Sequence, residues 1–217
     1  MLSVLIPTFN NEKHLSKAIA SCISLKYVAE IIIMDDCSQD DTELLIKKIK
    51  KNIHIIKYYK NNRNLGVGKS FIKAIKKSNY PYILMLNSDD FFIPKGIDNL
   101  FDFTIKNHLD LSYGKMAIQK KNKIFKYSHP GYLNKSYVNN RNEFIDLMIF
   151  DMYMPSFGTI IKKSILQNFY DIKYMQKLDE EFGDIFKAHD YDLFLNLTKK
   201  NKKVGFLNEF VCVWKPS

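Results

Sequence analysis

Two short and mostly apolar segments, each followed by a pair of aspartates, constrain the fold of this chain most. The segment from Glu30 to Met34 runs directly into Asp35-Asp36, and the segment from Pro81 to Leu86 is followed by Asn87, Ser88 and then Asp89-Asp90. Such runs are typical of strands buried on both faces, as in a parallel sheet covered by helices. Ligands of open α/β sheets bind outside the carboxyl ends of the strands. The two acidic pairs are therefore predicted to face a common site.

Helical and strand patterns alternate over the first hundred residues with short connections, which indicates βαβ units and a largely parallel sheet. Strands are predicted over 3–6, 30–34, 53–59 and 81–86, and helices over 12–23, from 38 or 40 onward, and over 69–77. Asn10 or Asn11 is the expected cap of the first helix. In the second helix, Leu44, Leu45 and Ile49 are predicted to share one face, with lysines on the other.

The second half of the chain is less regular. Strands are predicted over 110–119, 124–128, 157–162, 203–207 and 210–214, and helices over 143–153 and 190–198. The first of these helices is apolar nearly all round, so a buried core, a dimer contact and a lipid-facing surface all stay open for it. Because no repeat or linker separates the halves, we expect residues 1–107 and 108–217 to share one compact domain.

Composition excludes several classes of protein. No apolar run approaches the roughly 20 residues of a membrane helix, and the N-terminus lacks the basic segment of a secretion signal, so we expect a cytoplasmic chain. Cys22, Cys37 and Cys212 are too far apart for a disulfide framework or zinc site, and we expect reduced thiols. The net charge of +10 fits solvated faces, an anionic membrane leaflet at the inner face, or nucleic acid, which is the least favoured.

The residues around the acidic pairs indicate a chemistry. Adjacent carboxylates on a loop, as at Asp89-Asp90, suit a hard divalent cation whose coordination is completed by phosphate oxygens. Residues 61–69 contain glycines and Lys69 near a helix start, although their spacing is not that of a P-loop. Asp36 is positioned to accept a hydrogen bond from a uracil or thymine N–H. The alternative is that an aspartate of each pair only caps the next helix, but a cap needs one carboxylate, not two.

At this point the chain resembles the inverting glycosyltransferases of family 2, which have the GT-A fold. The resemblance rests on five segments in the family's order and spacing: residues 3–12, 30–42, 64–66, 82–90 followed by Pro94, and 189–193. It implies an open, mostly parallel twisted sheet flanked by helices, with a nucleotide-sugar-binding half over 1–107 and an acceptor-side half over 108–217. It also implies transfer of a hexosyl or N-acetylhexosaminyl group from a nucleoside diphosphate sugar, expected to be UDP-linked.

The resemblance further implies roles for individual residues. The second aspartate of Asp89-Asp90 is expected to bind Mg²⁺ or Mn²⁺, the first to approach ribose or metal, and Asp190 to act as the general base. Asp36 is expected at N3–H of the base. The full set of expected nucleotide-binding residues is Pro7, Phe9, Asn10, Asp36, Asn64, Gly66, Lys69, Ser88 and Asp89. The acceptor is expected to be a hydroxyl of a surface polysaccharide, a lipid-linked sugar or another glycan.

The chain departs from the family pattern at two places. Phe71 stands where many members have an arginine, and Trp214-Lys215-Pro216-Ser217 stands for Tyr-Arg-x-His, after which the sequence stops. We expect a chain that is shortened at its C-terminus. Rival bases for Asp190 are Glu181, Asp184 and Asp192. Rival functions are another nucleotide-dependent transferase or nucleotidyltransferase on the same sheet, and a non-catalytic module that binds nucleotides or nucleic acid.

Overall fold

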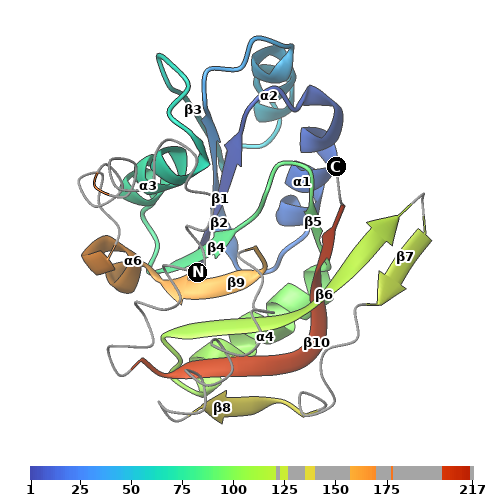
Figure 1. Cartoon of the computed structure of the whole chain (residues 1–217), viewed down its shortest axis with the longest axis vertical. Helices are drawn as coiled ribbons and strands as arrows, with labels where there is room; N and C mark the ends of the chain where they lie inside the picture. Colours follow the sequence, from blue (N-terminus) through green and yellow to red (C-terminus); the bar gives the residue numbers. More distant parts are fainter. Residues whose placement is uncertain (121–122, 127–134, 140–156, 170–176, 178–201, 216–217) are drawn as a thin grey trace.

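The computed structural model describes residues 1–120, 123–126, 135–139, 157–169, 177 and 202–215 (Figure 1). Its helices and strands, in chain order, are β1 (Leu2–Thr8), α1 (Glu12–Ile23), β2 (Val28–Asp35), α2 (Thr42–Lys50), β3 (Ile56–Lys60), α3 (Val67–Lys77), β4 (Tyr82–Met85), β5 (Phe91–Phe92), α4 (Pro94–Lys106), β6 (Leu111–Lys120), β7 (Lys123–Lys126), β8 (Tyr137–Asn139), β9 (Thr159–Lys162), α6 (Lys163–Phe169) and β10 (Val204–Trp214).

One sheet runs through both halves of the chain, in the order β3-β2-β1-β4-β9-β6-β10-β5. The first four strands are mutually parallel, as the alternation of strand and helix patterns predicts. The sheet then becomes mixed, because β9 pairs antiparallel with both β4 and β6, while β10 runs parallel to β6. The parallel part places the carboxyl ends of β2, β1 and β4 side by side at one edge.

Helices cover both faces of this sheet. Along β1, Leu5 packs with α3 and α6 on one face, whereas Val4 and Ile6 pack with α1 and α4 on the other, as the two-residue period of a strand requires. Helix α4 approaches β10 closely at Gly96, where an added Cβ would lie 2.0 Å from the carbonyl oxygen of Phe210. This contact accounts for a glycine inside the helix despite its poor helix propensity.

The predicted elements agree with the structure except at a few places. Helix α1 has the predicted bounds, but α2 begins at Thr42 and buries Thr42 and Ile46, so Leu44 is 64% exposed and not on the buried face. The two strands predicted over 203–207 and 210–214 are one strand, β10, whose register against β6 shifts near Leu207 and Phe210. Helix α4 was not predicted. The helices predicted over 143–153 and 190–198 lie outside the described residues.

Two expectations from composition can be compared with the structure. No helix among the described residues is both long and apolar enough to cross a membrane. Cys22 and Cys212 are buried free thiols, as expected, and Cys37 is a half-exposed free thiol.

Candidate active site

Three loops that follow parallel strands meet at the carboxyl edge of the sheet. They are Phe9–Asn11 after β1, the turn beginning at Asp36 after β2, and Asn87–Asp90 after β4. The Asn10 N–H donates to Ser38 Oγ (2.9 Å), and Asn11 Nδ2 donates to Ser88 Oγ (2.7 Å). The loop after β1 is thus bonded to each of its neighbours, so the two acidic pairs do border one site, as predicted.

Asp36 binds the loop that contains Asn64 and Gly66. Its Oδ1 accepts hydrogen bonds from the Leu65 N–H (2.9 Å) and from Asn61 Nδ2 (2.8 Å), and its Oδ2 accepts one from the Gly66 N–H (2.8 Å). Gly66 has φ +84°, a conformation that favours glycine, and Asn64 Oδ1 also accepts from its N–H at 3.0 Å. A carboxylate has about four acceptor positions, and described residues of the protein occupy three of those of Asp36, which is itself buried.

Asp35 stabilises the turn itself. Its Oδ1 accepts from the Ser38 N–H (2.8 Å), and its Oδ2 accepts from the Tyr58 hydroxyl (2.6 Å). Burial and the carboxylate of Asp35 raise the pKa of Tyr58. Both aspartates of this pair therefore have structural partners, although neither caps α2. The premise that a second carboxylate has no structural reason to be there is wrong for this pair.

The second acidic pair is used differently. Asp90 is buried, and its Oδ1 accepts from the Lys215 N–H (2.8 Å) while its Oδ2 accepts from Asn87 Nδ2 (3.0 Å). Burial raises the pKa of Asp90 to about 6, and the charge of Asp89 acts in the same direction against the two hydrogen bonds. Asp89 is half-exposed. Of the two predicted metal ligands, Asp89 is thus the one with an accessible carboxylate.

The donor set fits a cation that is bound together with phosphate. Among the residues that the structure describes, no cluster of three or more His, Cys, Asp or Glu side chains forms a complete metal site. Mg²⁺ commonly takes one or two carboxylates and completes its shell with water and substrate phosphates. Asp89, which is partly exposed and next to the buried Asp90, suits this way of binding a cation.

The remaining predicted nucleotide-binding residues lie around the same edge. Pro7 is half-buried near the end of β1, and Phe9 is 46% exposed. Lys69 lies in the first turn of α3, the helix that begins directly after Gly66. Ser88 is buried, and its hydroxyl is bonded to Asn11, as given above. Phe71, at the position of the family arginine, is buried in the core. Asp190, together with its rivals Glu181, Asp184 and Asp192, lies outside the described residues.

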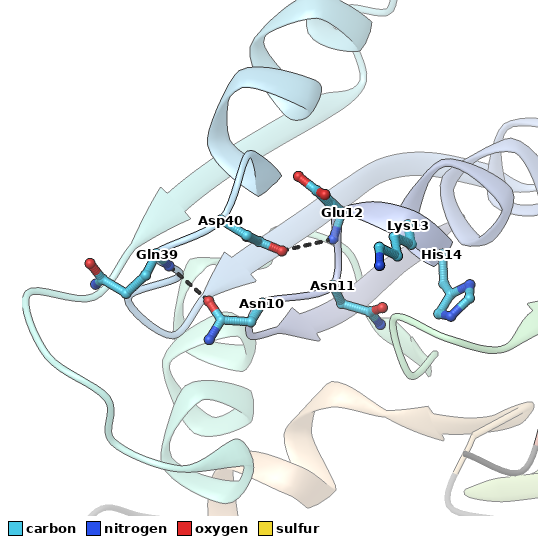
Figure 2. Close-up of a pocket in the computed structure, with 7 residues that line it drawn as sticks. All are labelled: Asn10, Asn11, Glu12, Lys13, His14, Gln39 and Asp40. Carbon is cyan, nitrogen blue, oxygen red and sulfur yellow. Dashed lines mark hydrogen bonds between the residues drawn. The ribbon is translucent and has the colours of Figure 1, made fainter.

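A polar pocket of about 570 Å³ opens beside this edge (Figure 2). Its lining residues are Asn10, Asn11, Glu12, Lys13, His14, Gln39 and Asp40. The Gln39 N–H donates to Asn10 Oδ1 (2.7 Å), and the Glu12 N–H donates to Asp40 Oδ2 (3.1 Å), as the dashed lines in Figure 2 mark. Asn10 has φ +48° and is thereby held in a left-handed conformation at the pocket rim.

Sequence reasoning missed three contributors to the edge. Asn61 links Asp36 to Ser70 Oγ, and Lys215 binds Asp90 through its backbone N–H from the other end of the chain. Thr8 Oγ1 is buried and has no hydrogen-bond partner among the described residues. A polar residue at the carboxyl end of a buried strand was the available signal for Thr8. Nothing in the sequence pairs Lys215 with Asp90.

Comparisons with known proteins agree with this architecture. The family model described as glycosyl transferase family 2 matches residues 3–169. The chain is 30% identical over 186 residues to the poly(ribitol-phosphate) beta-N-acetylglucosaminyltransferase TarP of Staphylococcus aureus, covering 83% of this chain and 54% of TarP. It is 25% identical over 202 residues to the GalNAc(5)-diNAcBac-PP-undecaprenol beta-1,3-glucosyltransferase of Campylobacter jejuni, covering 92% of this chain and 60% of that enzyme.

A solved structure has the same fold. The crystal structure of S. aureus TarS residues 1–349 in complex with UDP superposes with a TM-score of 0.76 at 20% identity, covering 100% of this chain and 60% of that one. The chain thus spans little more than half the length of TarP, and about 60% of the Campylobacter enzyme and of the crystallised TarS segment 1–349. Because the family model covers most of the sequence and the GT-A architecture agrees with it, the chain belongs to glycosyl transferase family 2.

Proposed function

We propose that this protein is a metal-dependent inverting glycosyltransferase that moves a sugar from a UDP-sugar to a hydroxyl acceptor. One observation carries the proposal. At the carboxyl edge of the sheet, Asp36 and the Leu65–Gly66 backbone bonded to it lie on the β2 side of β1, and the loop with Asp89 lies on the β4 side. Family membership supports sugar transfer. TarP and the Campylobacter enzyme, both named as sugar transferases, support the hexosyl or N-acetylhexosaminyl class.

The nucleotide is assigned to the β2 side of the edge. Phe9 offers an exposed ring on which a base would stack, and the fourth acceptor position of the buried Asp36 carboxylate, on Oδ2, is proposed for the N3–H of uracil. Support for uridine comes from TarS, whose structures are titled as complexes with UDP and with UDP-GlcNAc. Gly66 and Lys69, at the start of α3, lie on the same side, because they follow β3, the neighbour of β2.

The diphosphate and its cation are assigned to the β4 side, at Asp89. Mg²⁺ or Mn²⁺ bound there would neutralise charge that develops on the departing UDP. Asp89 would hold the cation, while the buried Asp90 fixes the Asn87–Asp90 loop through Lys215 and Asn87. Asp90 as a direct ligand stays a prediction.

The acceptor side rests on the sequence alone. Asp190 is proposed as the base that takes the proton of the acceptor hydroxyl, whose oxygen then attacks C1 of the donor sugar from the face opposite to UDP, so that the anomeric centre inverts. The named acceptors of TarP and of the Campylobacter enzyme are a ribitol-phosphate polymer and a lipid-linked glycan, which supports a surface-polymer or lipid-linked acceptor here. The cytoplasmic location stays a prediction.

Nucleotide binding tests this proposal directly. Thermal unfolding is measured with UDP, ADP and no nucleotide, each in Mn²⁺ and in a chelator. We expect UDP with Mn²⁺ to stabilise most, by about 2.7 kcal/mol when free UDP is 100 times its dissociation constant. Equal stabilisation by UDP and ADP, or by UDP in the chelator, would contradict the assignment of the base or of the cation, respectively.

Transfer itself is tested with the donor that binds. UDP release in the presence of candidate acceptors should fall by about 10²- to 10⁴-fold in Asp190→Asn, with UDP affinity unchanged. Transfer by this variant at the normal rate would move the base to one of its acidic rivals. Release of pyrophosphate from UTP and a sugar 1-phosphate, with no transfer from the UDP-sugar, would make the chain a nucleotidyltransferase.

A further inference from the structure

The carboxylate of Asp36 is buried without a cation beside it. The residue is 3% exposed, and no lysine or arginine of the described residues forms an ion pair with it. Its three hydrogen-bond donors are the backbone N–H groups of Leu65 and Gly66 and the side-chain amide of Asn61. A buried charge is costly unless it is paired and hydrogen-bonded. Asp36 therefore depends on how firmly these neutral donors are held in place.

The Asn61 amide is held by α3. Lys73 Nζ donates a hydrogen bond to Asn61 Oδ1 at 2.8 Å. Asn61 Nδ2 donates to Ser70 Oγ and to Asp36 Oδ1, each at 2.8 Å. Ser70 and Lys73 are three residues apart on α3, so they lie on the same side of the helix. Both N–H groups of the amide and its oxygen thus have partners.

These contacts fit only one orientation of the Asn61 amide. The oxygen and nitrogen ends of an amide have similar shapes, so the neighbouring groups decide which end faces which. An ammonium group only donates hydrogen bonds, and an ionised carboxylate only accepts them. The reverse orientation would set the amide oxygen against Asp36 and the amide nitrogen against Lys73. Lys73 therefore keeps a donor directed at Asp36.

The positive charge of Lys73 is not neutralised by an acid in the described part of the chain. The side chain is half-buried and forms no ion pair there, whereas Lys60 pairs with Glu43 at 2.9 Å. The charge polarises the Asn61 amide, whose N–H groups point to Asp36 and Ser70. Hydrogen bonds in such a chain strengthen one another where the local dielectric constant is low. The chain from Lys73 thus stabilises the buried carboxylate from two hydrogen bonds away.

The same chain restricts the movement of the carboxylate. Asn61 binds Oδ1 of Asp36, and the Gly66 N–H binds Oδ2, so both oxygens are held from the protein side. If Lys73 were removed, Asn61 Oδ1 would lose its donor and the amide would be free to turn away. Asp36 could then rotate, and its fourth acceptor position would no longer be fixed.

We propose that Lys73 is a positioning residue for base recognition. Acting through Asn61, it fixes the Asp36 carboxylate so that Oδ2 accepts a hydrogen bond from the N3–H of uracil, and it thereby sets the preference for uridine nucleotides. Lys73 itself does not touch the nucleotide. The inference rests on the proposed function, because it concerns the same base site.

The native chain is tested first with two nucleotides. UDP and CDP share the ribose and the diphosphate, but N3 of cytosine carries no hydrogen to donate. Calorimetric titration with Mn²⁺ gives both dissociation constants. We expect the native chain to prefer UDP by about 10- to 100-fold, the usual contribution of a hydrogen bond to a charged group. Equal affinity would contradict the base assignment in the proposed function, and the inference would fail with it.

Lys73→Met then separates positioning from a merely structural role. We expect it to lower UDP affinity about fivefold and to leave CDP affinity unchanged, because only uracil uses the fixed acceptor position. The preference for UDP should shrink by the same factor. Lys76→Met, at an exposed position on the same helix, changes the net charge equally and should leave both affinities unchanged. Lys73→Arg keeps a charged donor and should keep the native preference.

Two results would overturn the inference while leaving the proposed function intact. One is a native preference for UDP in Lys73→Met. The other is an equal loss of affinity for UDP and CDP in that variant, which would make the role of Lys73 purely structural. Thermal unfolding without nucleotide shows whether each variant is folded. If Lys73→Met is not, Lys73→Gln gives the same comparison, because its side chain is shorter and has no charge.

Discussion

The two acidic pairs at the carboxyl edge look alike in sequence and differ in the structure. At Asp35-Asp36, both carboxylates accept hydrogen bonds from the protein, and Asp36 alone accepts three. At Asp89-Asp90, only Asp90 is bonded inward, to Lys215 and Asn87, and Asp89 is left half-exposed. A strand followed by two aspartates therefore indicates a site, but does not by itself tell which carboxylate meets the ligand.

The difference has a physical basis in the hydrogen-bond donors that take the place of water around each carboxylate. Burying a carboxylate is costly unless hydrogen-bond donors compensate for the lost water. Asp36 has several such donors because the Asn64–Gly66 loop folds over it. Asp90 has fewer, and burial raises its pKa to about 6. The following predictions test two points. The first is whether Asp35-Asp36 is mainly structural, and the second is whether Asp89 binds the cation while Asp90 fixes its loop.

The largest effect is expected for Asp36→Ala. The change leaves the Leu65 and Gly66 N–H groups and Asn61 without their acceptor, and hydrogen bonds to charged groups contribute about 1.5–3 kcal/mol each. We expect a loss of about 4 kcal/mol in the free energy of unfolding, measured in urea. Asp102→Ala, which removes one exposed acceptor for Tyr27, is the control and should cost under about 1 kcal/mol. A stable Asp36→Ala would show that the pair is not structural.

Two variants, Asp89→Asn and Asp90→Asn, test which carboxylate of the second pair binds the cation. We expect Asp89→Asn to abolish the part of UDP stabilisation that depends on Mn²⁺, out of a total of about 2.7 kcal/mol at 100 times the dissociation constant, with little change in the free protein. Asp90→Asn should keep most of it, because its side chain is bonded inward. Thermal unfolding of both variants with UDP and Mn²⁺ measures this. The opposite pattern would make Asp90 the metal ligand, as the family resemblance implies.

The pH dependence of stability sharpens the role of Asp90. Its pKa in the folded protein, about 6, is above the ordinary value of 3.8, so the folded state binds the proton more tightly than the unfolded state does. The stabilising contribution is fully present below about pH 4 and is lost as pH rises through 6, a change of about 2 kcal/mol. Asp90→Asn should remove this decline, as urea unfolding at pH 4 and pH 7 would measure. An unaltered decline would assign it to another group.

The smallest effect is expected for Thr8→Val. The buried Thr8 hydroxyl has no partner in the described part of the chain, so replacing it with a methyl group should raise the free energy of unfolding by up to about 1 kcal/mol, because an unpaired buried hydroxyl carries a desolvation cost. If the hydroxyl meets a ligand at this edge, UDP affinity should fall by about 1 kcal/mol, a hydrogen bond's usual contribution. Calorimetric titration measures it. Equal affinity would restrict the nucleotide to the Asp36 and Asp89 sides.

Much of the N-terminal half could be predicted because its elements are local. The bounds of α1 follow from apolar spacing, and the parallel order of β3, β2, β1 and β4 follows from alternating strands and helices. Helix α4 was missed although Pro94 at its first position is a helix-start signal. Gly96 lowers the helix propensity of the segment, and only the structure shows that the glycine allows α4 to pack closely against Phe210. The exposure of Leu44 was also missed, because α2 packs through Thr42 and Ile46, and Leu44, two residues from each, lies on the opposite side of the helix.

The sequence by itself determined that acidic residues end two buried strands, and therefore that a site lies at the carboxyl edge of an α/β sheet. The tertiary structure alone decided which acids are available there. Asp36 is bonded to a loop about 30 residues further along the chain, and Asp90 to Lys215 near its other end. Local patterns encode strand and helix periods, whereas the partner of a buried carboxylate is set by which distant backbone N–H the fold brings within hydrogen-bond distance.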